Sequence, residues 1–562
     1  MAQQRKAVIV GVDGATFDLI RPWVAQGHLS NFRRLMEEGS HAVMRAPITA
    51  PLSPASWSSF ATGLTPAHHG ILDFIKLTPY SYGHTIQTSR MRRGASLWDY
   101  LGQRGRTVGV SEVPLTYPPD KVNGYMISGH PAPTQKKTFT SPKSLQQELL
   151  KAVPDMVSST VDAVRASLFG TNKHARFAEG IRRMTRTRLQ SGLWLFERSQ
   201  QDLFCHVLVT TDWASHFYWH FADPESPLDV PAEDGKRHAS VILEMYEFAD
   251  QFIGEMLRRL GDETTLFVMS DHGFCRNYDV LNMHRWLADR GLLAFTSRRE
   301  RGSARLIGKV GTQLTRALPR KLMHWLNVHF PKAMRRAREV KEFGHVNFSR
   351  THAYPMGTYR HIYINLRGRQ PQGIVEPGEQ YEQLRTRLIG ELAELRHPRT
   401  GSAVVRRVHR REEIMQGPFL EEAPDLLIEW ADHTFRFGSA ESGPGPVFSA
   451  LEISAKPFQR TADHAPEGIL LAYGRDIGRG RELPDCMIMD VLPTVMHAMG
   501  EPVPEGVDGR VLEEFFTEEF RAENPVSSFV PRDEAAKEGE DVFAGEEDKE
   551  VAEHLRGLGY ID

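Results

Sequence analysis

Acidic and histidine side chains stand at the ends of three apolar, β-branched segments. Asp13 closes the run "KAVIVGVDG", Asp212 closes "LFCHVLVTTD", and Asp271 and His272 follow the apolar part of "TTLFVMSDHG". A single aspartate at such a place is most often a helix cap or a turn residue. In an open α/β sheet, however, ligands bind at the carboxyl ends of the strands. Three such ends therefore predict that these side chains meet in one site.

Two more histidines extend this set. His216 follows Asp212 by four residues, so both side chains share one face if a helix turn begins there. His464, in "TADHAPEGILLAYG", lies just before another strand-like run and taken alone would be an ordinary loop histidine. The carboxylates and imidazoles offer only oxygen and nitrogen donors, which suits two zinc or manganese ions and disfavours calcium. Two such ions are typical of in-line displacement at phosphorus.

This chemistry also needs a hydroxyl nucleophile. The stretch "APITAPLSPASWSSFATGLTPAHHGI", residues 46–71, has too many hydroxyls and prolines for one helix and too much apolar content for a linker. It holds several serines and threonines, and the residue types alone do not single one out.

The bulk composition excludes several classes of protein. The chain has 562 residues, is 40% hydrophobic and carries a net charge of −2, which indicates a globular protein with no general attraction to nucleic acid or anionic membrane. Cys205, Cys275 and Cys486 are too scattered for a disulfide framework or a thiolate zinc site. No apolar run approaches the roughly 20 residues that span a bilayer, and no signal region precedes the first strand. We expect a cytoplasmic protein.

The elements that must position these residues are short apolar strands that alternate with helices. Strands are predicted at 6–14, 105–113, 203–212, 264–273, 425–431 and 468–474. Helices are predicted at 31–39, 96–105 and 242–261. Nearly continuous apolar strands between helices indicate an α/β fold with a mostly parallel central sheet covered on both faces.

Two segments differ in composition from the predicted catalytic core at 1–516. Residues 296–342 are strongly basic and predict a helical insertion that caps the core. Its basic face could be solvated, could form an electropositive lid over an anionic substrate, or could bring a helix into peripheral contact with a membrane. Residues 517–562 predict a flexible acidic tail, with "VAEHLRGLGYID" as a short terminal helix that docks back.

The ordered series of motifs resembles the alkaline phosphatase superfamily, in its type I phosphodiesterase/nucleotide pyrophosphatase branch and in the phosphohydrolase or phosphomutase form. The motifs are "VIVGVDGATFD", "LSPASWSSFATGLTPAHHGILDF", "SLWDYLGQRGRTVGVSEVPLTYPPDKVNGYMISG", "SDHGF", "DHAPEGILLAYG" and "MDVLPTVMHAMGEPVPEGVDGRVL". The resemblance implies an α/β/α sandwich and a two-metal hydrolase of a small phosphorylated substrate.

The resemblance also implies how the ligands divide. One ion belongs to Asp212, His216 and His464, and the other to Asp13, Asp271, His272 and the nucleophile. In this branch the nucleophile stands ten residues before the glycine of a Thr-Gly pair. Counting back from Gly63 gives Ser53, which we favour over Thr49 because Thr49 lies four residues too far upstream. Ser53 would form a phosphoseryl intermediate, and "SWSSFATG" would form the helix behind it.

Departures from the family pattern bear on the substrate. Ser56 stands where nucleotide pyrophosphatases carry an asparagine that holds phosphoryl oxygens, so Ser56 is the expected substrate-binding hydroxyl and nucleotide preference does not carry over. The absence of a C/S-x-P-x-R motif disfavours a sulfatase. "LSPASWSSF" is uncharged, which favours diesters over monoesters, although Arg298 or Arg305 of the basic insertion could supply a charge. His68 and His69 are expected to be structural.

Three alternatives stay open. A phosphomonoesterase, or a cofactor-independent phosphomutase of the same superfamily, would use the same metals and serine. A binding protein with a decayed site would be expected to have lost some ligands, whereas all six are present. The sequence does not indicate the oligomeric state.

Overall fold

The computed structural model describes most of the chain. The described residues are 4–47, 51–78, 80–132, 137–156, 172–296, 345–431, 435–437, 445–452, 459–531, 551–552, 555–556 and 558. Thr49, Arg298, Arg305 and nearly all of the basic segment 296–342 lie outside these residues, so the predictions for them stay predictions.

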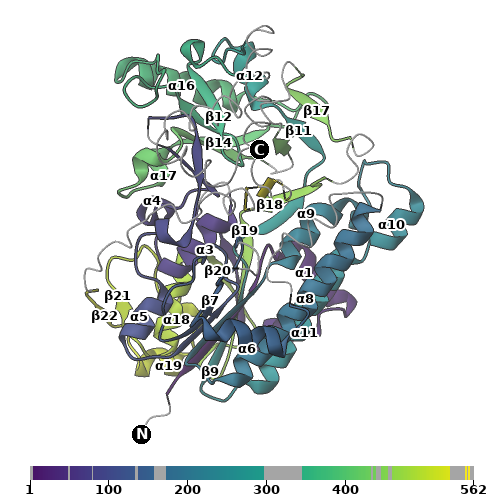
Figure 1. The fold of residues 1–562 in the computed structure, drawn as a ribbon, viewed down its shortest axis with the longest axis vertical. Coiled ribbons are helices and arrows are strands. Elements are labelled where there is room, and N and C mark those ends of the chain that lie inside the picture. Colours follow the sequence, from purple (N-terminus) through teal and green to yellow (C-terminus); the bar gives the residue numbers. More distant parts are fainter. Residues whose placement is uncertain are drawn as a thin grey trace, which may run out of the picture.

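A nine-stranded, mostly parallel sheet forms the centre of the molecule (Figure 1). Its strands, in spatial order, are β20 (Arg481–Met487), β2 (Ser40–Arg45), β19 (Glu467–Tyr473), β9 (Thr264–Met269), β1 (Lys6–Val12), β8 (Leu203–Leu208), β5 (Val108–Ser111), β6 (Gly124–Ile127) and β7 (Thr140–Ser141). Within it, β19 runs antiparallel to β2 and β9, and β7 runs antiparallel to β6. The predicted α/β fold class is confirmed.

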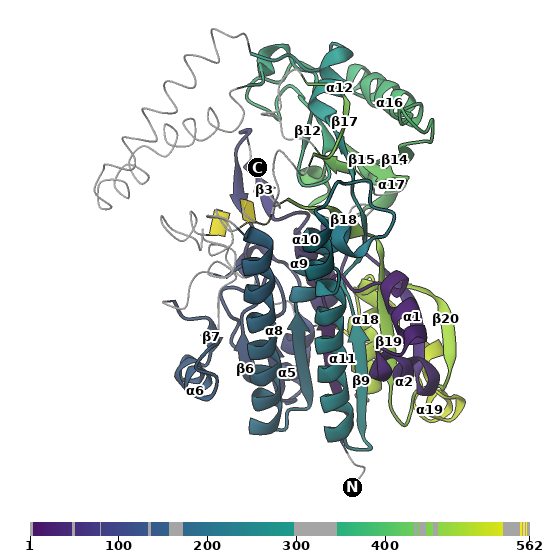
Figure 2. The same cartoon turned by 90° about the vertical axis from the view of Figure 1, so that its right-hand side faces the viewer.

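The middle strands are mostly apolar and are buried along nearly their whole length because helices cover both faces. Ile9 of β1 is fully buried, with Cys205 of β8 and Phe267 of β9 beside it in the parallel register. One face carries α1 (Phe17–Gln26), α2 (Ser30–Glu38), α8 (Lys173–Arg198), α9 (Thr210–Ala222) and α11 (Val241–Arg259). The other face carries α3 (Ser53–Thr62), α5 (Leu97–Gln103) and α18 (Val491–Ala498) (Figures 1 and 2).

A smaller assembly lies beyond the carboxyl edge of this sheet and has a hydrophobic cluster of its own (Figure 1). Its four-stranded antiparallel sheet has the order β12 (Ala353–Met356), β13 (His361–Ile364), β15 (Leu426–Trp430) and β14 (Val405–Arg410). It is flanked by α12 (Met283–Asp289), α16 (Glu379–Ala393), α17 (Arg411–Ile414) and a three-stranded sheet of β16 (Phe435–Phe437), β11 (Asp279–Leu281) and β17 (Phe448–Ala450). The assignment of strand 425–431 to the parallel sheet was therefore wrong.

The remaining described elements are small. They are α4 (Pro66–His69), α6 (Ser144–Ala152), α10 (Ala232–His238), α19 (Glu518–Glu523), and the pairs β3 (Ile75–Leu77) with β4 (His84–Ile86), β10 (Gly273–Arg276) with β18 (Ala462–Ala465), and β21 (Val503–Pro504) with β22 (Ser528–Phe529). Helix α19 lies within the segment predicted as a tail, and Val551, Leu555 and Leu558 belong to the main hydrophobic cluster. None of the described helices is long and apolar enough to cross a membrane.

Candidate metal centre

The three central strands deliver four of the predicted ligands to one edge of the sheet. Asp13 directly follows β1, and Asp271 and His272 follow β9 after one residue. Asp212 lies in the first turn of α9, which begins two residues after β8. Because β1 pairs in parallel with both β8 and β9, these residues emerge side by side, as the strand ends predicted.

The other two histidines come from α9 and from the antiparallel pair of β10 and β18. His216 lies one helical turn after Asp212 on α9, as the spacing predicted. His464 lies on β18, where it pairs with Phe274 of β10, and so belongs to a short strand rather than to a loop. Both elements reach the same edge of the central sheet, so all six predicted ligands come together.

Ser53 is the first residue of α3, and that helix is fixed against β1. Trp57, one turn further on, donates a hydrogen bond from Nε1 to Asp13 Oδ2 at 3.0 Å. The indole lies so close to β1 that a Cβ at Gly11 would stand 2.7 Å from Trp57 Cη2, which explains the glycine. No described side chain caps the start of α3. Pro54 has no N–H and Ser56 N donates to Leu52 O at 2.9 Å, so the N–H groups of Ser53 and Ala55 are those that suit a phosphate.

The first ligand group surrounds the serine. His272 Nε2 lies 3.2 Å from Ser53 Oγ, 3.2 Å from Asp271 Oδ2 and 3.9 Å from Asp13 Oδ1. Gly14, with φ of 70°, donates its N–H to Asp271 Oδ1 at 3.2 Å. Asp13, Asp271 and His272 thus offer three ligand atoms within 4.8 Å of one another.

The second ligand group adjoins the first. His464 Nε2 lies 2.9 Å from His216 Nε2 and 3.1 Å from Asp212 Oδ1, and His216 Nε2 lies 3.4 Å from Asp212 Oδ1. The His464 ring stacks on the His272 ring with 3.6 Å between centroids. Asp212 Oδ1 is also 4.0 Å from His272 Nε2, so the two groups form one continuous centre.

Backbone carbonyls contact Nδ1 of all three imidazoles, among them Ala462 O at 2.9 Å from His216 Nδ1. His464 Nδ1 lies 3.0 Å from Pro51 O, and His272 Nδ1 lies 3.1 Å from Gly273 O. Because a carbonyl only accepts, Nδ1 carries the proton in both rings and Nε2 presents its lone pair to the centre. This is the arrangement typical of histidines that bind a metal.

Charge is crowded in the centre. Burial, and then the negative charges of Asp271 and Asp212, hold the pKa of Asp13 well above its ordinary value. Burial also raises the pKa of Asp271 to about 7. Burial lowers the pKa of His216 to about 4 and that of His272 well below the ordinary value, so both rings are neutral at pH 7. Neutral imidazoles and closely spaced carboxylates can bind a cation as ligands, and a bound cation would offset the repulsion between the carboxylates.

Two buried oxygens support this fit. Asp13 Oδ1 and Asp271 Oδ2 have no hydrogen-bond partner among the described residues. A buried carboxylate oxygen without a partner is costly unless a cation coordinates it. The residues present therefore fit divalent ions at this edge of the sheet.

Several residues of the centre were not singled out from the sequence. Arg460 contacts His216, and Asp463 accepts hydrogen bonds from Arg460 Nη2 at 3.0 Å and from Tyr359 OH at 3.3 Å. Asp463 adjoins His464 in "TADHAP", which was the available signal for it. Trp57 carried no signal, because a buried tryptophan in a helix is usually a core residue.

The structure also describes the surroundings of Ser56, His68 and His69. Ser56 is fully buried one turn after Ser53, and its Oγ has no hydrogen-bond partner among the described residues. His69 is buried, lies 3.0 Å from Ser59 Oγ, and has a pKa that burial lowers to about 3. His68 Nδ1 lies 2.7 Å from Asp508 Oδ2. Those contacts agree with structural roles for both histidines.

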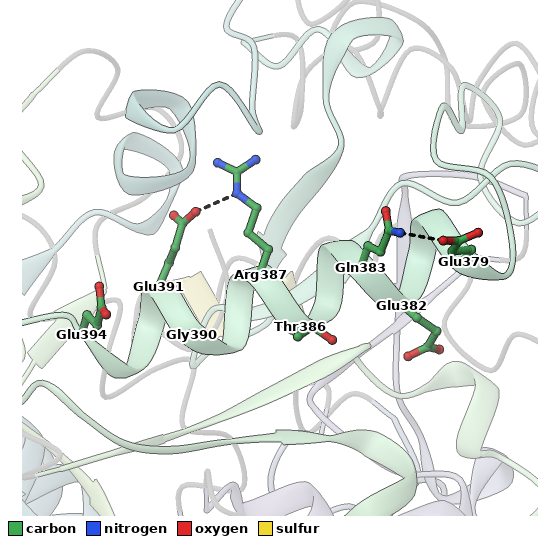
Figure 3. Close-up of a pocket in the computed structure, with 8 residues that line it drawn as sticks. All are labelled: Glu379, Glu382, Gln383, Thr386, Arg387, Gly390, Glu391 and Glu394. Atoms are coloured by element: carbon green, nitrogen blue, oxygen red, sulfur yellow. Dashed lines mark hydrogen bonds and ion pairs between the residues drawn. The ribbon is translucent and has the colours of Figure 1, made fainter.

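An open groove of about 700 Å³ lies elsewhere, along α16 (Figure 3). Its lining consists of Glu379, Glu382, Gln383, Thr386, Arg387, Gly390, Glu391 and Glu394. Arg387 Nε donates to Glu391 Oε1 at 2.7 Å, so its charge is already paired. An acidic surface of this kind repels a phosphate, and the groove therefore does not compete with the centre as a substrate site.

The fold and the centre define an α/β protein with a buried Asp/His cluster suited to divalent ions. Residues 7–462 match the family described as type I phosphodiesterase / nucleotide pyrophosphatase, and the chain belongs to this family. This match confirms the branch of the alkaline phosphatase superfamily that the sequence motifs predicted. It also supports a hydrolase of the phosphodiesterase type. The match includes all the predicted ligands except His464, which lies two residues beyond it.

Two solved structures of murine ectonucleotide pyrophosphatase/phosphodiesterase 5 are similar to this chain. One is an inactive variant in complex with AMP, with 13% identity, a TM-score of 0.47, and coverage of 89% of this chain and 96% of that chain. The other has 13% identity, a TM-score of 0.47, and coverage of 91% and 100%. A comparison with curated proteins gave no match.

Proposed function

We propose that the protein hydrolyses phosphoric diesters or pyrophosphate-type linkages through a covalent intermediate on Ser53. The observation that carries this proposal is the position of Ser53 Oγ, 3.2 Å from His272 Nε2, within a buried cluster of Asp and His side chains. Two divalent ions would be held by the two ligand groups. When bound, they would activate the hydroxyl and stabilise charge on the leaving oxygen.

The chain's own residues have separable roles in this reaction. Ser53 Oγ forms a bond to phosphorus while the bond to the leaving oxygen breaks, and the serine proton passes to solvent. Water then attacks phosphorus, the bond to Ser53 Oγ breaks, and the serine is regenerated. At the start of α3, the backbone N–H groups of Ser53 and Ala55 would donate to the phosphoryl oxygens. Trp57 holds that helix against Asp13 and so fixes the nucleophile.

Ser56 is the proposed phosphoryl-binding hydroxyl. It lies three residues after Ser53 on α3 and therefore on the same face of the helix, whereas Ser58 lies on a different face. A hydroxyl can donate to a free phosphoryl oxygen without adding charge. An uncharged donor at this position favours a diester, which carries one negative charge fewer than a monoester.

Zinc is the better-suited ion and manganese the alternative, because the donors combine imidazole nitrogen with carboxylate oxygen. We also propose, from the sequence alone, that the protein is cytoplasmic. The competing function is a phosphomutase. Such an enzyme would transfer phosphate within one substrate, and the basic insertion would act as its lid.

The test is a comparison of substrates on protein with a measured metal content. Purified protein should contain zinc or manganese by elemental analysis and should hydrolyse bis(p-nitrophenyl) phosphate with a higher kcat/KM than p-nitrophenyl phosphate. An active protein without a bound transition metal would overturn the metal assignment. A preference for the monoester, or isomerisation of a sugar or glycerate phosphate, would replace the diesterase by one of its two alternatives.

A further inference from the structure

A buried guanidinium lies beside the candidate metal centre. The Arg460 side chain is only 5% exposed. Its Nε lies 2.9 Å from His216 Nδ1, and its Nη2 lies 2.5 Å from His216 Nε2. Since arginine stays protonated in proteins, the centre holds a permanent positive charge in addition to any bound ion.

A carboxylate keeps this charge in place. Asp463 Oδ1 accepts from Arg460 Nη2 at 3.0 Å, from the backbone N–H of His464 at 3.0 Å and from Tyr359 OH at 3.3 Å. The turn that carries Tyr359 is fixed in its own right, because Thr358 N donates to Asp73 Oδ2 at 3.0 Å. The guanidinium is thus fastened to a well-supported acceptor rather than to a mobile surface group.

The position of Arg460 relative to the nucleophile is informative. Ser53 adjoins His272 of the first ligand group, whereas Arg460 adjoins His216 of the second. In an in-line displacement the attacking and leaving oxygens stand on opposite sides of phosphorus. Arg460 therefore lies on the leaving-group side, provided that Ser53 is the nucleophile as proposed above.

We propose that Arg460 is a specificity-determining residue that selects substrates whose leaving group carries a negative charge of its own. The phosphate released from a pyrophosphate linkage is such a group, and a guanidinium binds it through two parallel hydrogen bonds. A cation at His216 Nε2 repels the guanidinium, whereas Asp463 and an anionic leaving group attract it. An aryl diester offers only one leaving oxygen, which the bound ion would stabilise, and no second charged oxygen for the guanidinium to bind.

The test compares Arg460→Ala and Arg460→Lys on a dinucleoside pyrophosphate and on bis(p-nitrophenyl) phosphate. Arg460→Ala should lower kcat/KM for the pyrophosphate by about 10- to 100-fold, the loss typical of a charged hydrogen bond, and by less than about threefold for the aryl diester. Arg460→Lys should keep part of the activity. Arg276→Ala, which removes a half-exposed arginine on β10, is the matched control and should change neither.

Binding gives a second readout. Inorganic phosphate, measured by calorimetry, should bind Arg460→Ala about tenfold more weakly than wild type at unchanged metal content. Equal losses on both substrates, or loss of bound metal in both Arg460 variants, would overturn the inference, since Arg460 would then only support the centre. If wild type hydrolyses neither substrate, the proposed function fails, and the phosphate affinities alone decide the inference.

Discussion

The two ligand groups share one edge of the sheet but differ in charge. The group beside Ser53 contains two carboxylates, Asp13 and Asp271, which balance a divalent ion. The other group contains Asp212, and the second carboxylate near it, Asp463, is paired with Arg460, so a divalent ion there would keep an excess positive charge. Arg460 and Asp463 form a charge pair at its border. Under the mechanism proposed above, the centre would therefore be electrostatically polarised from Ser53 toward the leaving oxygen, where negative charge would develop during the reaction.

The groups also differ in how they are built. Asp13, Asp271 and His272 follow adjacent strands of the rigid central sheet. The second group joins helix α9 to the antiparallel strand pair β10–β18, and the smaller assembly supports it through Tyr359. The group beside Ser53 is therefore fixed by the core, whereas the group with His216 and His464 depends on contacts between separate parts of the chain.

The largest effect should come from Ser53→Ala, which removes the nucleophile and leaves the ligands in place. We expect kcat to fall by roughly three orders of magnitude or more, with bound metal and melting temperature close to wild type. Thr49→Ala is the control and should have a mild effect. If the two variants behave the other way round, Thr49 is the nucleophile.

Replacement of one histidine in each ligand group by alanine should distinguish the two metal sites. Elemental analysis should find two ions per wild-type chain, and both His464→Ala and His272→Ala should retain about one, because each breaks a single group. The two variants should both lose most activity. Retention of both ions by His464→Ala would show that this histidine is not a ligand.

The burial of Asp271 beside Ser53 predicts a pH-dependent stability of the metal-free protein. Asp271 has a pKa of about 7 in the folded chain against an ordinary value of 3.8, so its ionisation destabilises the fold as pH rises. Metal-free Asp271→Asn should therefore melt above metal-free wild type at pH 8. The advantage should vanish below about pH 4, grow up to about pH 7 and then stay constant. A pH-independent difference would contradict this origin.

The smallest effect should come from Tyr359→Phe. The change removes one hydrogen bond to Asp463 and leaves the ring packing, so about 1 kcal/mol is at stake, or roughly fivefold in kcat/KM. Bound metal should stay at the wild-type level. An effect as large as that of Arg460→Ala would show that Tyr359 touches the substrate itself.

The sequence predicted the part of the molecule that periodicity and strand ends determine. The strands that carry Asp13, Asp212 and Asp271, and the i,i+4 placement of His216, follow from local pattern. Strands β2 and β20 were not predicted because they carry charged residues near the sheet edge, and β20 contains Pro484, which only an edge strand tolerates.

The contacts of Arg460 could not be predicted in the same way. They join residues 244 positions apart, and no local spacing encodes such a contact. Tyr359 likewise reaches Asp463 across 104 positions, from a turn between two strands of the smaller sheet. The strand at 426–430 has the same apolar pattern as the central strands, so pattern alone did not assign it to the antiparallel sheet.

The most direct test of the central claim is detection of the covalent intermediate. Wild-type protein mixed with bis(p-nitrophenyl) phosphate, quenched in acid within the first turnovers and digested, should yield a peptide whose phosphoryl adduct maps to Ser53 by tandem mass spectrometry. The adduct should be absent from Ser53→Ala. An adduct on another residue, or full turnover by Ser53→Ala, would contradict the assignment of Ser53 as the nucleophile of a two-metal hydrolase.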